Sequence, residues 1–165
     1  MDDQATPDPT MTRIIEAVQL GHRGDPTRAR EQLTALWDDI GPAGDALHRC
    51  ALAHHLADLQ DTAAAELLWD ERALAAAADL TDDRATRYDR ALQVRGFLPS
   101  LHLNLADVHR RLGDTTRARA HLDTARGHAA HLPADPYGDL VRAGIEHVDQ
   151  ALAAGSTDRL DSHPG

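Results

Sequence analysis

The chain has 165 residues, of which 42% are hydrophobic, and this is enough for one globular domain with a buried core. Aromatic residues make up only 3%, so leucine and alanine must form most of that core, and both residues favour helices. The formal net charge of −10 argues against a nucleic-acid partner, because binding to phosphates requires a basic surface.

Membrane and export signals are not expected from this sequence. No apolar run reaches the roughly 20 residues that cross a bilayer, and the acidic opening MDDQATPDPT does not resemble a secretory signal. Cys50 is the only cysteine, so no disulfide can form within the chain. We therefore expect a cytoplasmic protein that binds neither membranes nor nucleic acids.

Three predicted helix starts share the pattern aspartate-proline: Asp8-Pro9, Asp25-Pro26 and Asp135-Pro136. An aspartate side chain caps the first turn of a helix, and proline suits the next position, where the backbone N–H has no helical partner. The two ends of the sequence lack apolar periodicity. We expect disordered tails over residues 1–8 and 155–165, on either side of one helical domain over residues 9–154.

Apolar residues between these tails recur every three or four positions, which predicts amphipathic helices. Short turns join these helices into three antiparallel pairs. The pairs cover residues 9–22 with 26–40, 45–59 with 62–79, and 98–112 with 118–132. Because no segment alternates apolar and polar residues as a strand does, the predicted fold is all-α.

Residues 80–98 interrupt this regular pairing. Thr81 can cap a helix whose apolar stripe includes Tyr88, and Gly96 can end it. The segment is therefore either an extra inserted helix or an extension of its neighbours. A last helix starts at Asp135-Pro136, and we expect it to cap the open apolar face at the end of the stack.

The stretch NLADVHRRLGDTTRARAHLDTA, residues 104–125, resembles a tetratricopeptide repeat, a helix hairpin of about 34 residues. Leu105-Ala106 take the place of the family's Leu-Gly pair, and Gly113-Asp114 take the place of the turn between the helices. The alternation of small and large residues in the second helix matches at Ala118, Leu122 and Ala125. The two earlier helix pairs follow the same pattern more weakly.

The resemblance implies a short α-solenoid of about three helix hairpins, with an inserted helix and a C-terminal capping helix. His102 and His109 stand where the family has tryptophan and tyrosine, so we expect flat packing side chains there. His121, His128 and His131 lie on the second helix of the same pair, and we expect them at the surface.

The resemblance also implies a function, since the first helices of such hairpins line a concave groove that binds a protein or peptide segment. Seven residues of the second and third pairs are expected to line this groove: Cys50, His54, Asp58, Asn104, Asp107, Arg110 and Arg111. The acidic balance of the chain favours a basic partner over an acidic one. A monomer and a homodimer are both compatible with the sequence.

Cys50, His54 and Asp58 also suggest an alternative function, because they follow one another at spacings of four residues on one helix. Each can bind zinc, so the chain could be a small-ligand- or metal-binding helical protein, with or without catalytic activity. A structural zinc site has four ligands, however, and no pattern of an activated nucleophile accompanies Cys50. We therefore expect no metal, no cofactor and no enzymatic activity.

Overall fold

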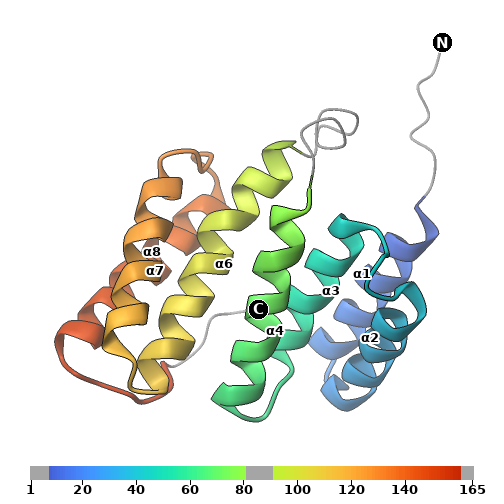
Figure 1. Cartoon of the computed structure of the whole chain (residues 1–165), viewed down its shortest axis with the longest axis horizontal. Helices are drawn as coiled ribbons and strands as arrows, with labels where there is room; N and C mark the ends of the chain where they lie inside the picture. The colour runs from blue at the N-terminus through green and yellow to red at the C-terminus, as the bar shows by residue number, and fades with distance from the viewer. Residues whose placement is uncertain (1–7, 81–90, 161–165) are drawn as a thin grey trace.

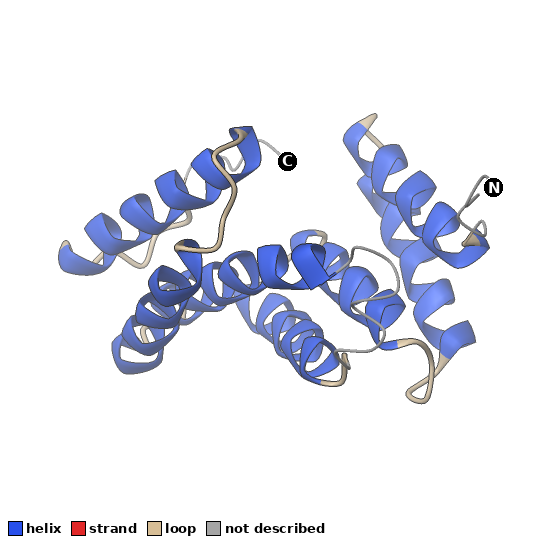
Figure 2. Ribbon diagram, turned by 90° about the horizontal axis from the view of Figure 1, so that it is seen from above, coloured by secondary structure: helices blue, strands red, loops and turns tan. Residues whose placement is uncertain are grey.

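The computed structural model describes residues 8–80 and 91–160, with side chains described for residues 8–80 and 98–160. These residues form helices and loops, and no strand occurs among them (Figure 1, Figure 2). The helices are α1 (Pro9–His22), α2 (Pro26–Ile40), α3 (Ala46–Asp58), α4 (Ala63–Ala78), α6 (Ala91–Arg111), α7 (Thr115–Ala129) and α8 (Pro136–Ala153). The prediction of an all-α fold is confirmed for this part of the chain. None of these helices is both long enough and apolar enough to span a membrane.

The aspartate-proline pairs start three of the helices, as predicted. The side chains of Asp8, Asp25 and Asp135 accept hydrogen bonds from backbone N–H groups three residues later, at 2.9, 3.1 and 2.8 Å. Thr62 and Asp114 cap α4 and α7 in the same way. Because each such cap stabilises its helix by about 1 kcal/mol, the local sequence determines where these helices begin.

Consecutive helices pack as adjacent pairs, α1 with α2, α3 with α4, and α6 with α7. α2 also packs on α3, α4 on α6, and α7 on α8, so the pairs follow one another along the long axis of the molecule (Figure 1). Small side chains let paired helices approach closely. Alanines without exposed surface occur in all three pairs: Ala17, Ala29, Ala53, Ala73, Ala106, Ala118 and Ala125.

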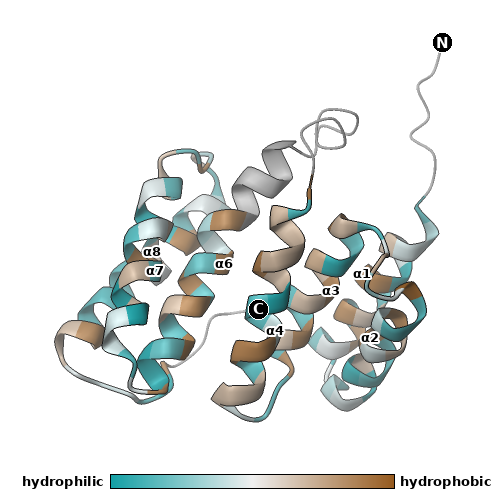
Figure 3. Ribbon diagram, viewed as in Figure 1, coloured by the Kyte–Doolittle hydropathy of each residue, from teal (hydrophilic) through white to brown (hydrophobic). Residues whose placement is uncertain are grey.

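Buried apolar side chains form three clusters. The first joins α1, α2 and α3 around Leu33 and Leu52. The second joins α3, α4 and α6 around Leu101, and the third joins α6, α7 and α8 around Leu122 and Val148. α4 is coloured apolar along most of its length, since this helix consists largely of alanine and leucine (Figure 3).

Residues 91–98 extend α6 at its start, so for these residues the extension of a neighbouring helix holds and the separate inserted helix does not. The helix continues through Gly96, so the prediction that Gly96 ends a helix is wrong. Pro99 also lies inside α6 and is fully buried. The packing of α6 on α4, α7 and α8 compensates for the hydrogen bond that a proline removes from a helix interior. The first part of the predicted insertion, residues 81–90, lies outside the described residues.

α8 packs closely on α6 at Gly144. A Cβ atom at this glycine would lie 2.7 Å from Cδ2 of Leu103, which is closer than carbon atoms can approach. Val141, Ile145 and Val148 on the same helix join the cluster between α6 and α7. The missing side chain at Gly144 therefore allows α8 to lie against α6.

Asp8 and residues 155–160, which fall within the expected tails, make defined contacts. Arg110 donates two hydrogen bonds to backbone carbonyl groups after α8, so the disorder expected over residues 155–165 does not apply to residues 155–160. Asp8 caps α1, and its Oδ2 lies 2.7 Å from Nε2 of His48. The remaining residues of both tails lie outside the part of the chain that the structure describes.

Candidate binding groove

A groove of about 600 Å³ extends from α1 to α8. Its middle is polar, with charged side chains from α3, α4 and α6. Apolar side chains line it toward both ends, Val18 and Leu33 from α1 and α2 and Tyr137 and Leu140 from α8, and His22 of α1 also lines the first end. Residues 159–160, which follow α8, also line the groove.

The structure brings most of the predicted site residues together in this groove. The predicted residues that line it are His54, Asp58, Asn104, Asp107 and Arg111. All of them come from α3 and α6, the first helices of the second and third pairs. Their role in binding a partner stays a prediction.

Cys50 does not line the groove. It is 3% exposed and packs between α3, α4 and α6, next to Ala53, Ala73 and Leu101. Burial raises the pKa of its thiol to about 11, so the thiol stays protonated at neutral pH. Each step of four residues rotates by about 40° around a helix. Cys50 and Asp58 are two such steps apart, and they therefore face different directions.

The alternative metal site lacks the required geometry for the same reason. Cys50 points into the core, whereas His54 and Asp58 line the groove. Over residues 8–80 and 98–160, no group of three or more histidine, cysteine, aspartate or glutamate side chains is arranged to hold a metal ion. Cys50, His54 and Asp58 therefore do not form one site.

Arg110 is the second predicted groove residue that lies elsewhere. Its side chain is 2% exposed. It donates hydrogen bonds to Oδ1 of Asp107 and to the carbonyl groups of Ser156 and Asp158. Arg110 thus ties α6 to the residues after α8. Sequence patterns do not reveal this role, because the two carbonyl groups are 46 and 48 residues away.

Arg111 joins two carboxylates on the floor of the groove. Its Nη2 donates to Oε1 of Glu66 at 2.6 Å, and its Nε donates to Oδ2 of Asp107 at 3.0 Å. Burial acts to lower the pKa of Arg111, but the two carboxylates outweigh burial and raise it. The sequence does not single out Glu66, because the second helix of a pair is not expected to reach the groove.

Asp70 lies behind this floor, and the sequence does not single it out either. It is 1% exposed, and neither carboxylate oxygen accepts a hydrogen bond from any residue in the described part of the chain. Burial raises the pKa of its carboxyl group to about 8, and the negative charges of Glu66 and Asp58 contribute to this rise. Asp70 therefore holds its proton at neutral pH, and a cation that enters the groove would favour its ionisation.

Two histidines of the groove add no positive charge at neutral pH. Burial lowers the pKa of His54 and His55 to about 4. The groove is also lined by three carboxylates and two arginines: Asp58, Glu66, Asp107, Arg111 and Arg159. Carboxylates thus outnumber arginines even before Asp70 is considered.

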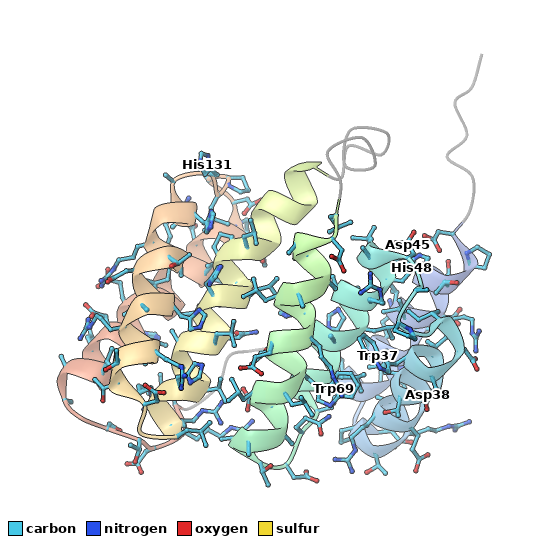
Figure 4. The ribbon with its side chains drawn as sticks, in the orientation of Figure 1. Trp37, Asp38, Asp45, His48, Trp69 and His131 are labelled. Carbon is cyan, nitrogen blue, oxygen red and sulfur yellow. The ribbon has the colours of Figure 1, made fainter. Side chains whose placement is uncertain are left out.

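Four histidines stack between α6 and α7, outside the groove. Nδ1 of His102 lies 3.1 Å from Nδ1 of His121, and the rings of His109 and His128 stack on this pair at centroid distances of 5.5 and 5.7 Å. The packing role expected for His102 and His109 is confirmed. The surface position expected for His121 and His128 is wrong, because the stack half-buries both. His131 is exposed after α7, as expected (Figure 4).

Trp37 and Trp69 meet edge to face between α2 and α4 (Figure 4), with ring centroids 5.1 Å apart. The guanidinium carbon of Arg72 lies 4.4 Å from the centroid of Trp69. Both tryptophans pack against the first two core clusters and therefore join them.

A comparison with protein-family models finds no match for this chain, and comparisons with curated proteins and with solved structures find none either. The groove and its side chains are therefore the basis for a functional proposal.

Proposed function

We propose that this chain is a binding module, a short solenoid of the tetratricopeptide type whose groove holds a basic segment of a partner protein. The motif in residues 104–125 and the packing of three successive helix pairs support the solenoid. The excess of carboxylates in the middle of the groove supports the basic partner. We propose binding without catalysis.

Asp70 is the observation that carries the proposal. A carboxyl group buried without hydrogen-bond partners destabilises the fold whenever it is charged. Asp70 does not line the groove, so a lysine or arginine side chain there would act on it at longer range, across the lining carboxylates Glu66 and Asp58, through a partly desolvated region that screens charge less than water does. The pKa of about 8 therefore describes the groove without a bound partner, and a bound cation would lower it.

The apolar ends of the groove suggest what flanks the basic residue. Tyr137 and Leu140 are 42% and 44% exposed on α8, and the half-buried Val18 lines the opposite end. Exposed apolar side chains beside a groove are typical of surfaces that bind other proteins. A segment with apolar residues on either side of a lysine or arginine fits this arrangement.

Selection from a random peptide library against the immobilised full chain would test this proposal. We expect the selected peptides to combine arginine or lysine with large apolar residues. Their affinity should fall about three- to tenfold in the variant Asp58→Asn, and it should also fall as salt is added. The control Asp123→Asn removes an exposed carboxylate of α7, a helix that does not line the groove, and should leave the affinity unchanged.

Calorimetry on the selected peptides would test the role of Asp70. Because Asp70 is protonated at neutral pH before a partner binds, binding of a basic peptide should release a proton. The binding enthalpy should then depend on the ionisation enthalpy of the buffer, and this dependence should disappear in Asp70→Asn. Selection of acidic peptides, or equal affinities for wild type and Asp58→Asn, would refute the proposal. Binding of a simple diamine at the same residues would favour the small-ligand alternative.

A further inference from the structure

The residues after α8 return toward the groove. α8 ends at Ala153, and Gly155 adopts a positive φ of 66° that reverses the chain. The backbone N–H groups of Gly155 and Ser156 donate to carbonyl groups in the last turn of α8, at 3.1 and 3.0 Å. We call residues 156–160, which follow this turn, the strap.

A buried arginine clamps the strap to α6. Nη1 of Arg110 donates to the carbonyl oxygen of Ser156 at 2.6 Å, and its Nη2 donates to that of Asp158 at 2.8 Å. Asp107 accepts the other hydrogen bonds of this guanidinium group through Oδ1, and its Oδ2 accepts from Arg111 on the groove floor. The position of the strap is therefore coupled to the charged floor through one carboxylate.

The strap places a basic and an apolar residue in the groove. Arg159 and Leu160 are both part of the groove lining. Leu160 is half-buried and packs against the cluster formed by α6, α7 and α8. Arg159 brings a positive charge into a lining that carries the carboxylates Asp58, Glu66 and Asp107. The chain thus already presents to its own groove the kind of residue pair that the groove's chemistry selects.

We propose that the strap is a resident occupant that a partner segment displaces, and that the partner carries a basic residue followed by a large apolar residue. This inference rests on the proposed binding function of the groove. Displacing the strap removes Arg159 from the lining, so an incoming cation meets a more negative groove, lined by Asp58, Glu66, Asp107 and Arg111.

A small number of contacts hold the strap in place, so a partner segment can displace it. Within the described part of the chain, the strap is attached by the backbone N–H of Ser156 to α8, by two carbonyl groups to Arg110, and by the side chain of Leu160 to the third core cluster. A longer partner segment can make the same contacts and add others along α1 and α3. Since the strap is covalently joined to the groove, it competes at an effective concentration of about the millimolar range. A partner segment must therefore bind the groove more strongly than the strap does at this effective concentration.

Titration of the isotope-labelled full chain with a defined probe tests the inference. The probe is the hexapeptide GSTDRL, the sequence of residues 155–160 with both ends blocked. Backbone amide shifts of groove residues such as His54 and Asn104 report binding. The double variant Arg159→Ser, Leu160→Ser weakens the strap without changing the groove floor. The control Arg28→Ser, Leu68→Ser removes an exposed arginine and an exposed leucine that do not line the groove.

We expect the strap variant to bind the probe at least about fivefold more tightly than the wild type and the control variant, because the strap no longer occupies the groove for most of the time. The peptide GSTDEL, with glutamate in place of arginine, should bind more weakly than the probe to every form. In the wild type, binding should also increase the fast motions of the strap amides, as measured by heteronuclear NOE.

Two results would overturn the inference. If the strap variant and the wild type bind GSTDRL and the library-selected basic peptides with equal affinity, the strap is not a competing occupant, although the groove still binds peptides. If neither form binds any of these peptides, the proposed function of the groove fails as well, and the inference fails with it. Thermal melting of each variant checks that the fold is intact.

Discussion

Substitution of Asp70 by asparagine should stabilise the protein at neutral pH. Asparagine has nearly the same shape as aspartate but carries no ionisable group. The folded wild type keeps a proton on Asp70 up to about pH 8, whereas the ordinary pKa of an aspartate is 3.8. Because the raised pKa belongs to the folded state, the wild type loses stability as the pH rises from about 4 to about 8. The variant Asp70→Asn does not lose stability in this way, because asparagine does not ionise.

The size of the effect follows from the pKa difference. Each pH unit between the unfolded and the folded pKa corresponds to about 1.4 kcal/mol. Between the ordinary pKa of 3.8 and pH 7, the wild type therefore loses about 4 kcal/mol of its unfolding free energy. The protonated carboxyl group and the amide both lie in the same site without hydrogen-bond partners, so their desolvation terms largely cancel. We therefore expect a gain of about 3–4 kcal/mol in the unfolding free energy at pH 7.

Urea unfolding followed by circular dichroism measures this gain. The difference between Asp70→Asn and the wild type should be near zero at about pH 4 and should grow until about pH 8. Comparing the two proteins at each pH cancels the contributions of the histidines, which titrate in the same range. Glu66→Gln, one turn earlier on α4, is a second comparison, and it should also lower the pKa of Asp70 because it removes a neighbouring negative charge. It removes a partner of Arg111 and should destabilise the fold by about 1–2 kcal/mol.

A flat difference across this pH range would refute the reasoning. Such a result would mean that Asp70 is ionised in the folded protein and that its charge is compensated there. Destabilisation by Asp70→Asn at pH 7 would lead to the same conclusion. Both outcomes would also remove the main support for a basic partner.

The histidine stack should make the protein sensitive to acid, because burial and the neighbouring histidines lower the pKa of His102 to about 4. The unfolding free energy should therefore fall as the pH decreases from about 6.5 to 4. In melting experiments at several pH values, His102→Phe should reduce this dependence of stability on pH. Cys50, whose thiol pKa is raised by burial to about 11, should react with a disulfide reagent at neutral pH only after unfolding, and rapid reaction of the folded protein would contradict its place in the core. Gly144→Ala should lower the unfolding free energy by about 1–3 kcal/mol, since the added Cβ would overlap Leu103. Gly127→Ala, on the exposed side of α7 with open space at the Cβ position, should instead raise it by about 0.5–1 kcal/mol.

The helix boundaries that depend on neighbouring residues could be predicted from the sequence. An aspartate before a proline forms its cap within three residues, so no distant contact is needed. Gly96 and Pro99 show the opposite case. Both residues disfavour a helix interior, but the packing of α6 on its neighbours overrides this preference, and packing cannot be read from a local pattern.

The composition of the groove could be predicted only in part. His54 and Asn104 lie on first helices whose faces follow from the apolar pattern. Asp70 could have been suspected, because it shares the buried stripe of α4 with Ala73 and Ala77, where a charged residue is out of place. The role of Arg110 could not be predicted from the sequence, because its partners Ser156 and Asp158 come close to it only when α8 has folded against α6.

The three separate core clusters have a consequence for the mechanics of the molecule. Trp37 and Trp69 join the first two clusters, whereas α6 supplies Leu101 to the second cluster and Leu103 to the third. α6 is therefore the element that links the second and third clusters. The groove crosses this link, because its lining extends from α1 to α8. A segment bound along the groove would contact helices on both sides of α6. Its binding would therefore make the two sides unfold as one cooperative unit.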